Sequence, residues 1–302
     1  MSPWFSTHFG PEVSYSKNWV FPSDLLWYDR WNEILELGSR FIEIITWNDY
    51  GESHYIGPLK SIHTDDGASK WVNDMWERYL ITTRRWCLAN LHRPHDGWLD
   101  ISKPYIAAFK DGAKSVTNYI TSDEIIYWYR PAPRDVNCDA TDTCMVPANN
   151  GSGNYFMGRP DGWQSMQDAI FVVSLLQSSA NVQVNSGGTL YTYEAPVGAF
   201  AQQIPMKIGV PSFTVIRNGS SVLSGTSLKP IIGGCVCGLY NFNAYGMEIR
   251  LFVSTKKLNH WDQLERYHLD PVTLYKQTDW RLSIRVFGFK HVRLPLHSAQ
   301  NL

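Results

Sequence analysis

The apolar run at residues 41–45 most constrains what this chain can fold into. It reads Phe-Ile-Glu-Ile-Ile and has strong strand propensity, and a nearly continuous run of this kind is typical of a parallel strand covered on both faces. Glu43 interrupts the run. Two interpretations of Glu43 stay open: an inward charge paired within a barrel, or a residue that supports a site. The run favours an α/β fold.

The polar loop after this run holds two carboxylates three positions apart, Asp49 and Glu52. Their Cα atoms lie less than about 7 Å apart in a turn and approach roughly 10 Å in an extended chain. Inverting glycosidases separate their carboxyl groups by about 6.5–9.5 Å and retaining ones by about 5–5.5 Å, so the spacing allows either outcome. Such pairs are most often solvated surface, but the aromatic and polar neighbours favour a site here: Trp47, Asn48, Tyr50, His54 and Tyr55.

A metal site built on Asp49, Glu52 and His54 is an alternative reading of the same loop. No second His or Cys lies nearby in the sequence. We therefore expect neither a metal nor another cofactor.

The stretch Thr46–Pro58 resembles the signature of glycoside hydrolase family 71, the fungal endo-1,3-α-glucanases or mutanases. Four further stretches are similar to that family in the same order, so that the resemblance covers roughly residues 1–245: 2–9 with 17–19, 94–98 with 104–112, 125–131 and 240–244. The family's catalytic acids fall on Asp49 and Glu52. Because the family is described as inverting, the resemblance implies one base and one acid, and we assign Asp49 as the base and Glu52 as the acid.

The resemblance also implies substrate-binding residues around these acids. The aromatic residues expected to line sugar subsites are Trp47, Tyr50, Tyr55, Trp4 and Trp19. Asn48 and His54 are expected to bind hydroxyl groups or to orient the acids. For His8 two interpretations stay open, a similar role or a core histidine with satisfied hydrogen bonds.

The fold implied is α/β, the C-terminal part of a (β/α)8 TIM-like barrel followed by an all-β sandwich. A complete barrel needs about 250 residues, and this chain reaches the Pro-rich stretch Arg130–Pro133 much sooner. We therefore expect an N-terminally truncated chain. The predicted organisation is a barrel portion at 1–131, a linker or long loop at 132–165 and a sandwich at 166–245, where short apolar or alternating runs are separated by turn residues.

Two stretches have no recognised counterpart in the family, residues 76–93 and residues 246–302. The first holds four Arg and one Glu, and the second holds nine Lys/Arg against five Asp/Glu. Our hypothesis is that both are translated intron and that the missing start is a gene-model error. Genuine extensions are the alternative, and sequencing the transcript decides between them.

Composition and cysteine usage set the remaining expectations. With 44% hydrophobic and 14% aromatic residues the chain is globular, and its net charge of −1 argues against nucleic acid as a partner. The sequence has no run of 18 apolar residues, so it does not predict a membrane span. Cys138 and Cys144 flank a short polar loop and are the candidate disulfide, whereas Cys235 and Cys237 are too close for an unstrained mutual bridge.

The resemblance implies an enzyme that hydrolyses α-1,3-glucosidic bonds in fungal cell-wall α-1,3-glucan. We expect a monomer that is secreted or held in the cell wall, with its signal peptide lost by truncation, and with the polysaccharide as its partner. The alternative is a non-catalytic α-glucan-binding fragment without a complete barrel.

Overall fold

The computed structural model describes residues 1–9, 17–21, 23–49, 51–58, 94–142, 158–236, 238–250 and 282–284. Several features of the sequence lie outside these residues: Tyr50, the stretch 76–93, Cys144 and most of the basic stretch 246–302. No helix among the described residues is long and apolar enough to cross a membrane.

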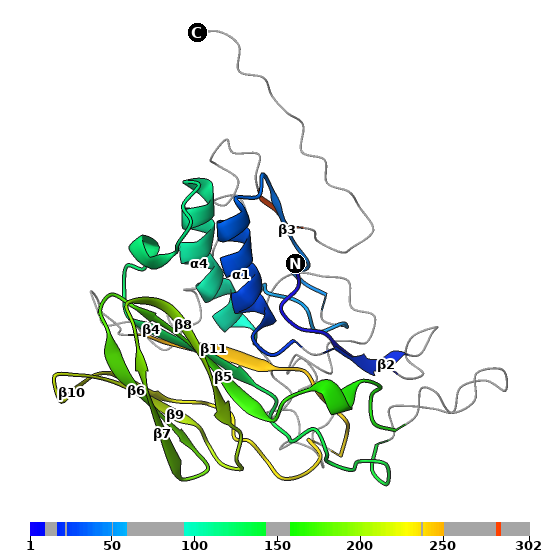
Figure 1. Ribbon diagram of the computed structural model, residues 1–302. Helices are drawn as coiled ribbons and strands as arrows, with labels where there is room; N and C mark the ends of the chain where they lie inside the picture. Colours follow the sequence, from blue (N-terminus) through cyan, green and yellow to red (C-terminus); the bar gives the residue numbers. More distant parts are fainter. Residues whose placement is uncertain are drawn as a thin grey trace, which may run out of the picture.

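Two four-stranded antiparallel sheets pack face to face and form the larger part of the described structure (Figure 1). The first has the order β11-β4-β5-β8, with the bounds Glu124–Tyr129 for β4, Ala169–Leu176 for β5, Gly198–Pro205 for β8 and Tyr245–Arg250 for β11. The second has the order β10-β9-β6-β7, with the bounds Ala180–Ser186 for β6, Thr189–Ala195 for β7, Ser212–Arg217 for β9 and Ser220–Thr226 for β10. Tyr127 stacks on Phe213 between the two sheets, with the ring centroids 4.3 Å apart.

Two helices cover the other face of the first sheet, α1 (Leu26–Leu37) and α4 (Asp96–Lys110) (Figure 1). The sequence predicts a helix from Leu25 to Leu37 with Ser23 as its N-cap and Gly38 at its end, and Gly38 does end α1 in a left-handed conformation, φ 64°. The predicted N-cap was wrong, because the residue there is Leu25 and the Ser23 hydroxyl donates instead to the Phe21 carbonyl oxygen. Two short 3-10 helices follow, at Thr117–Tyr119 and Trp163–Ser165.

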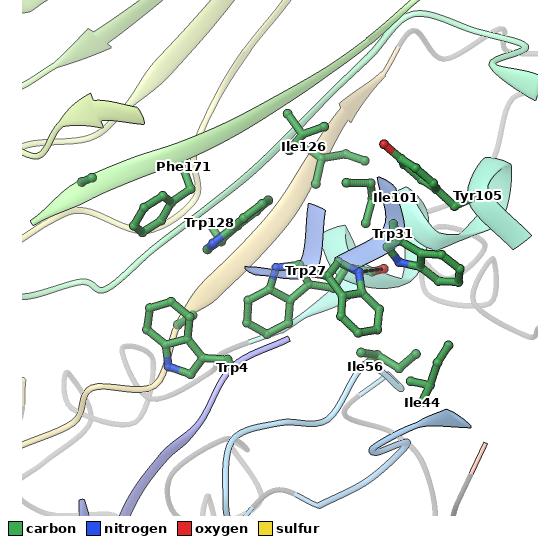
Figure 2. Packing of buried hydrophobic residues seen from close by; sticks show 14 of the residues in the cluster. Trp4, Trp27, Trp31, Ile44, Ile56, Ile101, Tyr105, Ile126, Trp128 and Phe171 are labelled. Carbon is green, nitrogen blue, oxygen red and sulfur yellow. Dashed lines mark hydrogen bonds between the residues drawn. The ribbon is translucent and has the colours of Figure 1, made fainter. Parts of the chain in front are cut away.

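Large aromatic side chains fill the space between the helices and the first sheet (Figure 2). Trp27 and Trp31 come from α1, Trp98 from α4 and Trp128 from β4, and all four are fully enclosed. The Trp27 indole nitrogen donates to the Trp98 carbonyl oxygen, which joins the two helices. The first sheet is therefore the middle layer of three.

Four short strands lie beside these layers. The strands β1 (Ser6–Phe9) and β2 (Lys17–Val20) form an antiparallel ribbon. The strands β3 (Ile42–Ile44) and β12 (Leu282–Ile284) pair in parallel over three residues. This is the one parallel ladder among the strands that the structure describes. Both β12 and most of β11 belong to the stretch 246–302.

The expectation of a (β/α)8 barrel portion was wrong. The strand β4, which the sequence presents as a barrel strand, lies between β11 and β5 and is antiparallel to both. After Glu124 its side chains are buried on both faces, because Ile126 and Trp128 face the helices while Tyr127 and Tyr129 face the second sheet. A continuous apolar run reports burial of both faces, and it does not report the direction of the neighbouring strands.

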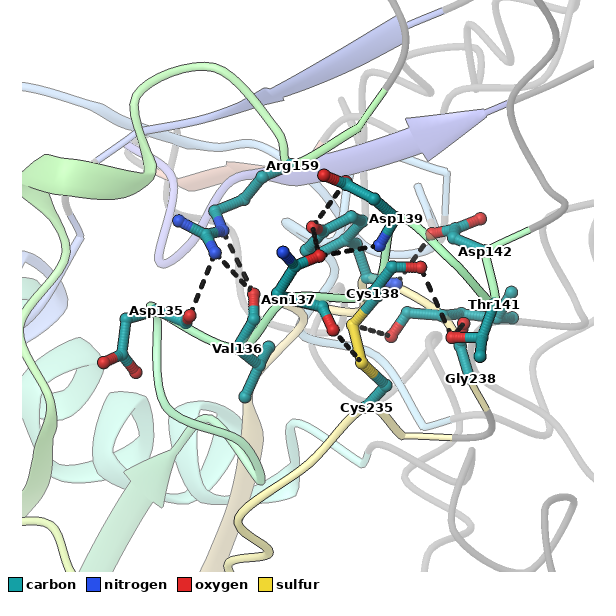
Figure 3. The surroundings of a disulfide bond; sticks show 12 residues. Asp135, Val136, Asn137, Cys138, Asp139, Thr141, Asp142, Arg159, Cys235 and Gly238 are labelled. Carbon is teal, nitrogen blue, oxygen red and sulfur yellow. Dashed lines mark hydrogen bonds between the residues drawn. A yellow bond between two sulfur atoms is a disulfide. The ribbon is translucent and has the colours of Figure 1, made fainter.

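The disulfide in the structure joins Cys138 to Cys235 (Figure 3), so the pairing of Cys138 with Cys144 was wrong. The bond ties the segment after β4 to the segment before β11. Hydrogen bonds continue the same junction, from the Thr141 hydroxyl to the Gly238 carbonyl oxygen (2.8 Å) and from the Tyr240 amide to Asp142 (2.8 Å). The partner could not be inferred locally, because the two cysteines are 97 positions apart.

Removing this disulfide will destabilise the protein. Cross-links that close long loops restrict the unfolded chain, and their loss typically costs about 2–4 kcal/mol. We expect Cys138→Ser and Cys235→Ser to lower the urea midpoint by the same amount, and the double substitution to lower it no further. A midpoint unchanged in either single variant would contradict the assignment.

Three carboxyl groups meet where α4 packs on β11: Asp96 and Asp100 from the helix and Glu248 from the strand. Asp100 is 3% exposed and pairs with Lys103, while Glu248 lies 3.6 Å from Arg250. Burial raises the pKa of Asp96 to about 7, and Asp100 adds to the shift. Burial also raises the pKa of Glu248, and the charge and hydrogen bond of Asp100 add to it.

Stability should therefore fall as the pH rises. The folded protein keeps protons on these groups that the unfolded chain releases above about pH 4. Each unit by which the pH rises, up to the pKa of the group in the folded state, therefore destabilises the native state. We expect Glu248→Gln to unfold at a higher temperature than the wild type at about pH 8, with a smaller difference at about pH 5. The exposed Glu33→Gln is the control, and equal behaviour of the two variants would refute the explanation.

Candidate active site

The loop after β3 folds back on itself and is closed by its own backbone. The Thr46 amide donates to the His54 carbonyl oxygen (3.0 Å), and the Ile56 amide donates to the Thr46 carbonyl oxygen (3.0 Å). The Gly57 amide completes the closure by donating to the Trp47 carbonyl oxygen (2.8 Å). A Cβ atom on Gly57 would lie 2.5 Å from that oxygen and 2.7 Å from the indole ring, so only glycine fits here.

The start of the chain supports this loop from the side. The Ser6 amide donates to the Glu52 carbonyl oxygen (3.1 Å), and the Ile45 amide donates to the Met1 carbonyl oxygen (2.9 Å). The edge of the Phe5 ring contacts His54, with the centroids 5.8 Å apart. The loop is thus fixed by bonds within itself and by bonds to the segment around β1.

This folding brings Asp49, Glu52 and His54 together. The Asp49 carboxylate accepts from the Glu52 amide (3.1 Å) and from His54 Nε2 (2.9 Å). The same nitrogen lies 3.4 Å from Glu52 Oε2. The Asp49 amide in turn donates to the Thr46 hydroxyl (2.9 Å). One imidazole nitrogen therefore faces both acids, and the two acids are held close together.

The three side chains suit acid–base chemistry on a ligand that arrives from solvent. The side chains of Asp49 and Glu52 are 23% and 24% exposed, whereas that of His54 is 10% exposed. One ligand atom from each residue lies within 4.8 Å of the other two. The same set could hold a divalent cation. In this structure His54 Nε2 lies between the two carboxylates, and each Asp49 oxygen has one hydrogen-bond partner in the loop.

A second, fully buried network lies beneath the loop. Tyr55 stacks on His95, with the ring centroids 3.8 Å apart and the planes at 10°. His95 Nδ1 donates to the Tyr55 carbonyl oxygen (2.8 Å), and His95 Nε2 lies 2.9 Å from Asn243 Oδ1. The side-chain amide of Asn243 donates through Nδ2 to the Tyr55 hydroxyl (3.2 Å). Tyr55 therefore supports the loop and has no exposed ring face to offer a sugar.

The other residues expected in the site differ in their exposure to solvent. Trp4 is 1% exposed, and its indole nitrogen donates to the Phe242 carbonyl oxygen, so it belongs to the core. His8 lies 2.6 Å from Asn18 Oδ1 and 2.7 Å from Asp142 Oδ2, which is the satisfied core histidine that the sequence left open. Asn48 is 6% exposed, while Trp19 and Trp47 are partly exposed.

Sequence reasoning missed several residues that shape the site. Phe5 contacts His54, and both His95 and Asn243 support the loop from below. Both of the last two residues lie in stretches that resemble the family, Pro94–Gly112 and Tyr240–Ala244, yet no spacing rule links them to residue 55. Their contacts depend on tertiary packing across 40 and 148 positions of the chain.

Comparisons with known proteins define the class to which this fold and site belong. The family model of glycosyl hydrolase family 71 matches residues 1–257. The chain is 41% identical over 246 residues to a mutanase of Penicillium rubens, covering 81% of this chain and 46% of that protein. It is 36% identical to a glucan endo-1,3-alpha-glucosidase of Schizosaccharomyces pombe, with coverage of 81% and 48%.

The chain therefore belongs to glycosyl hydrolase family 71. It is also 27% identical over 252 residues to an ascus wall endo-1,3-alpha-glucanase of Schizosaccharomyces pombe, covering 80% of this chain and 50% of that protein. The chain spans about half the length of the curated relatives it matches. No solved structure matches it.

Tyr55→Phe will destabilise the protein, because it leaves the buried side-chain amide of Asn243 without the hydroxyl group that accepts its hydrogen bond. The expected loss is about 1–2 kcal/mol in urea unfolding. Tyr55→Leu also removes the stacking on His95 and should cost more. Tyr191→Phe, on a partly exposed tyrosine of β7, is the matched control. The network would not support the loop if Tyr55→Phe and Tyr191→Phe unfolded alike.

Proposed function

We propose that this chain hydrolyses α-1,3-glucosidic bonds in cell-wall α-1,3-glucan, with Asp49 and Glu52 as the reacting carboxyl groups. One observation supports this above the others: a single imidazole nitrogen, His54 Nε2, faces both acids at 2.9 and 3.4 Å. The names of the relatives support the choice of substrate, since they describe a mutanase and endo-1,3-α-glucanases.

The proposed chemistry is a single displacement with inversion. Asp49 acts as the base and takes a proton from water while the water oxygen attacks the anomeric carbon. Glu52 acts as the acid and gives its proton to the oxygen that leaves. Asp49 suits the base because two hydrogen bonds, from the Glu52 amide and from His54, hold its carboxylate in one orientation.

The separation of the two acids bears on this proposal. Their nearest oxygens lie within 4.8 Å, whereas inverting enzymes hold their carboxyl groups about 6.5–9.5 Å apart to seat a water. The longer contact to His54 is the one from Glu52, at 3.4 Å. We propose that the bound sugar draws the Glu52 side chain away from His54 and opens the space for water.

His54 is a positioning residue in this proposal. Its Nε2 proton fixes the Asp49 carboxylate, and its ring is itself fixed by Phe5. The partly exposed rings of Trp47 and Trp19 suit the apolar faces of sugars. Asn48 and Tyr50 remain proposed substrate-binding residues, and Tyr50 lies outside the described residues.

We further propose that the protein acts outside the cell or in the wall. The disulfide between Cys138 and Cys235 needs an oxidising compartment to persist. One relative is named for the ascus wall. We keep the prediction that the chain acts as a monomer.

The proposal is tested by release of reducing sugar from α-1,3-glucan by the purified chain. Asp49→Asn and Glu52→Gln should each reduce the rate by about 10²–10⁴-fold, because each removes one proton transfer. Glu194→Gln, on an exposed glutamate of β7, is the matched control and should retain full activity.

Two results would overturn the assignment. Full activity in both variants would remove Asp49 and Glu52 from the reaction. Binding of the glucan without any release of sugar by the wild-type chain would favour the alternative, a glucan-binding fragment, which the half-length match to the relatives keeps open.

A further inference from the structure

The ribbon of β1 and β2 has two unlike faces. Ser6 pairs with Val20, and Thr7 pairs with Trp19, so the alternation of a strand sorts the side chains. One face holds Ser6, His8, Asn18 and Val20, and all four are at most 6% exposed. On the other face lie Phe5, Trp19 and Phe21. The ribbon thus packs one face on the molecule and carries three aromatic rings on the other.

These three rings form a row with Phe5 in the middle, and Phe5 is also the ring that contacts His54. Phe5 stacks on Trp19 with the centroids 6.3 Å apart and the planes at 12°. Phe5 also contacts Phe21 at 5.0 Å. Phe21 is 55% exposed, and Phe5 itself meets His54 edge to face, with the ring centroids 5.8 Å apart. The exposed ring is therefore two ring contacts away from the imidazole that faces Asp49 and Glu52.

Backbone hydrogen bonds hold the row in place on both edges of the ribbon. The Phe21 amide donates to the Phe5 carbonyl oxygen (3.3 Å), which joins the two strands. On the outer edge of β1, the Ser6 amide donates to the Glu52 carbonyl oxygen (3.1 Å). On the far edge, the Val20 amide donates to the Asp161 carbonyl oxygen (2.8 Å), and the Asp161 amide donates to the Asn18 carbonyl oxygen (3.0 Å). The distance between the rings and the acids is therefore fixed, as a binding surface requires.

We propose that Phe5, Trp19 and Phe21 form a stacking surface for a glucosyl unit next to the unit that reacts at Asp49 and Glu52. The inference rests on the proposed function for the identity of the sugar. A pyranose ring has one apolar C–H face, which gains free energy when it covers an exposed aromatic ring. The surface binds a glucosyl ring that lies beyond the cleaved bond. It therefore raises the affinity of the protein for the glucan.

The position of the row favours a polysaccharide over a protein partner. The row is continuous with the acids through Phe5 and His54, so a glucan chain that reaches Asp49 passes over it. Thr7, which lies opposite Trp19 on this face, is 1% exposed. The open part of the face is thus limited to Phe21 and the partly exposed rings of Phe5 and Trp19, an area that suits one sugar ring and is too small for a protein interface.

Binding to insoluble α-1,3-glucan in the Asp49→Asn, Glu52→Gln double variant tests this inference without hydrolysis. In that background, we expect Phe21→Ala to weaken binding about tenfold and Phe21→Trp to retain it. Phe41→Ala is the matched control, since Phe41 is 70% exposed and precedes β3, at the end opposite the site. It should bind as the double variant does. Because Phe21 is exposed, the circular dichroism spectrum should be unchanged.

The outcome separates the two proposals. Loss of binding with Phe21→Ala would uphold the stacking surface even if the wild-type chain released no sugar. Equal binding by Phe21→Ala and Phe41→Ala would overturn the surface even if Asp49 and Glu52 proved catalytic. Failure of the double variant to bind the glucan, or retention of binding by Phe21→Ala alone, would overturn it as well.

Discussion

The buried imidazole of His95 joins the parts of the structure on which the site depends. His95 directly precedes α4, and its ring stacks on Tyr55 in the loop and contacts Asn243 just before β11. The helix, the loop and the first sheet are thereby fixed at one point, with no solvent to compete for the hydrogen bonds. The orientation of the loop, and so of the acids at its tip, follows from this contact.

The acids are positioned by backbone more than by side chains. The turn from Thr46 to Gly57 is closed by its own amides, and the segment around β1 adds the bond from Ser6 to the Glu52 carbonyl oxygen. The side chains of Asp49 and Glu52 are therefore close enough to meet at His54. A loop backbone held in this way keeps its place when a ligand arrives, while the Glu52 side chain can still move away from His54, as the proposed mechanism requires.

Local patterns in the sequence located helix α1 and drew attention to the loop that holds the candidate acids. The apolar spacing and Gly38 located α1 closely, and the polar loop after β3 identified the residues that the structure brings together: Asp49, Glu52 and His54. Both are local properties. A run of side chains determines its own helix, and residues within six positions are close in any turn.

The errors concern contacts between distant parts of the chain. The strand β4 looked like a barrel strand because both of its faces are buried, yet an antiparallel sheet between helices and a second sheet gives the same pattern. The partner of Cys138 lies 97 positions away, at Cys235. Trp4 and Tyr55 were expected to line sugar subsites, and the structure encloses both in the core. Aromatic residues near a site serve packing or binding, and only their burial distinguishes the two.

Rescue of single alanine variants by azide tests the central claim most directly, because it assigns a role to each acid. Azide can replace the water that Asp49 activates, so with an α-1,3-linked oligosaccharide it should restore cleavage in Asp49→Ala and yield a β-glucosyl azide. Glu52→Ala should not respond, because the oxygen that leaves still lacks its proton. Rescue of Glu52→Ala but not of Asp49→Ala, or formation of an α-glucosyl azide, would contradict the account.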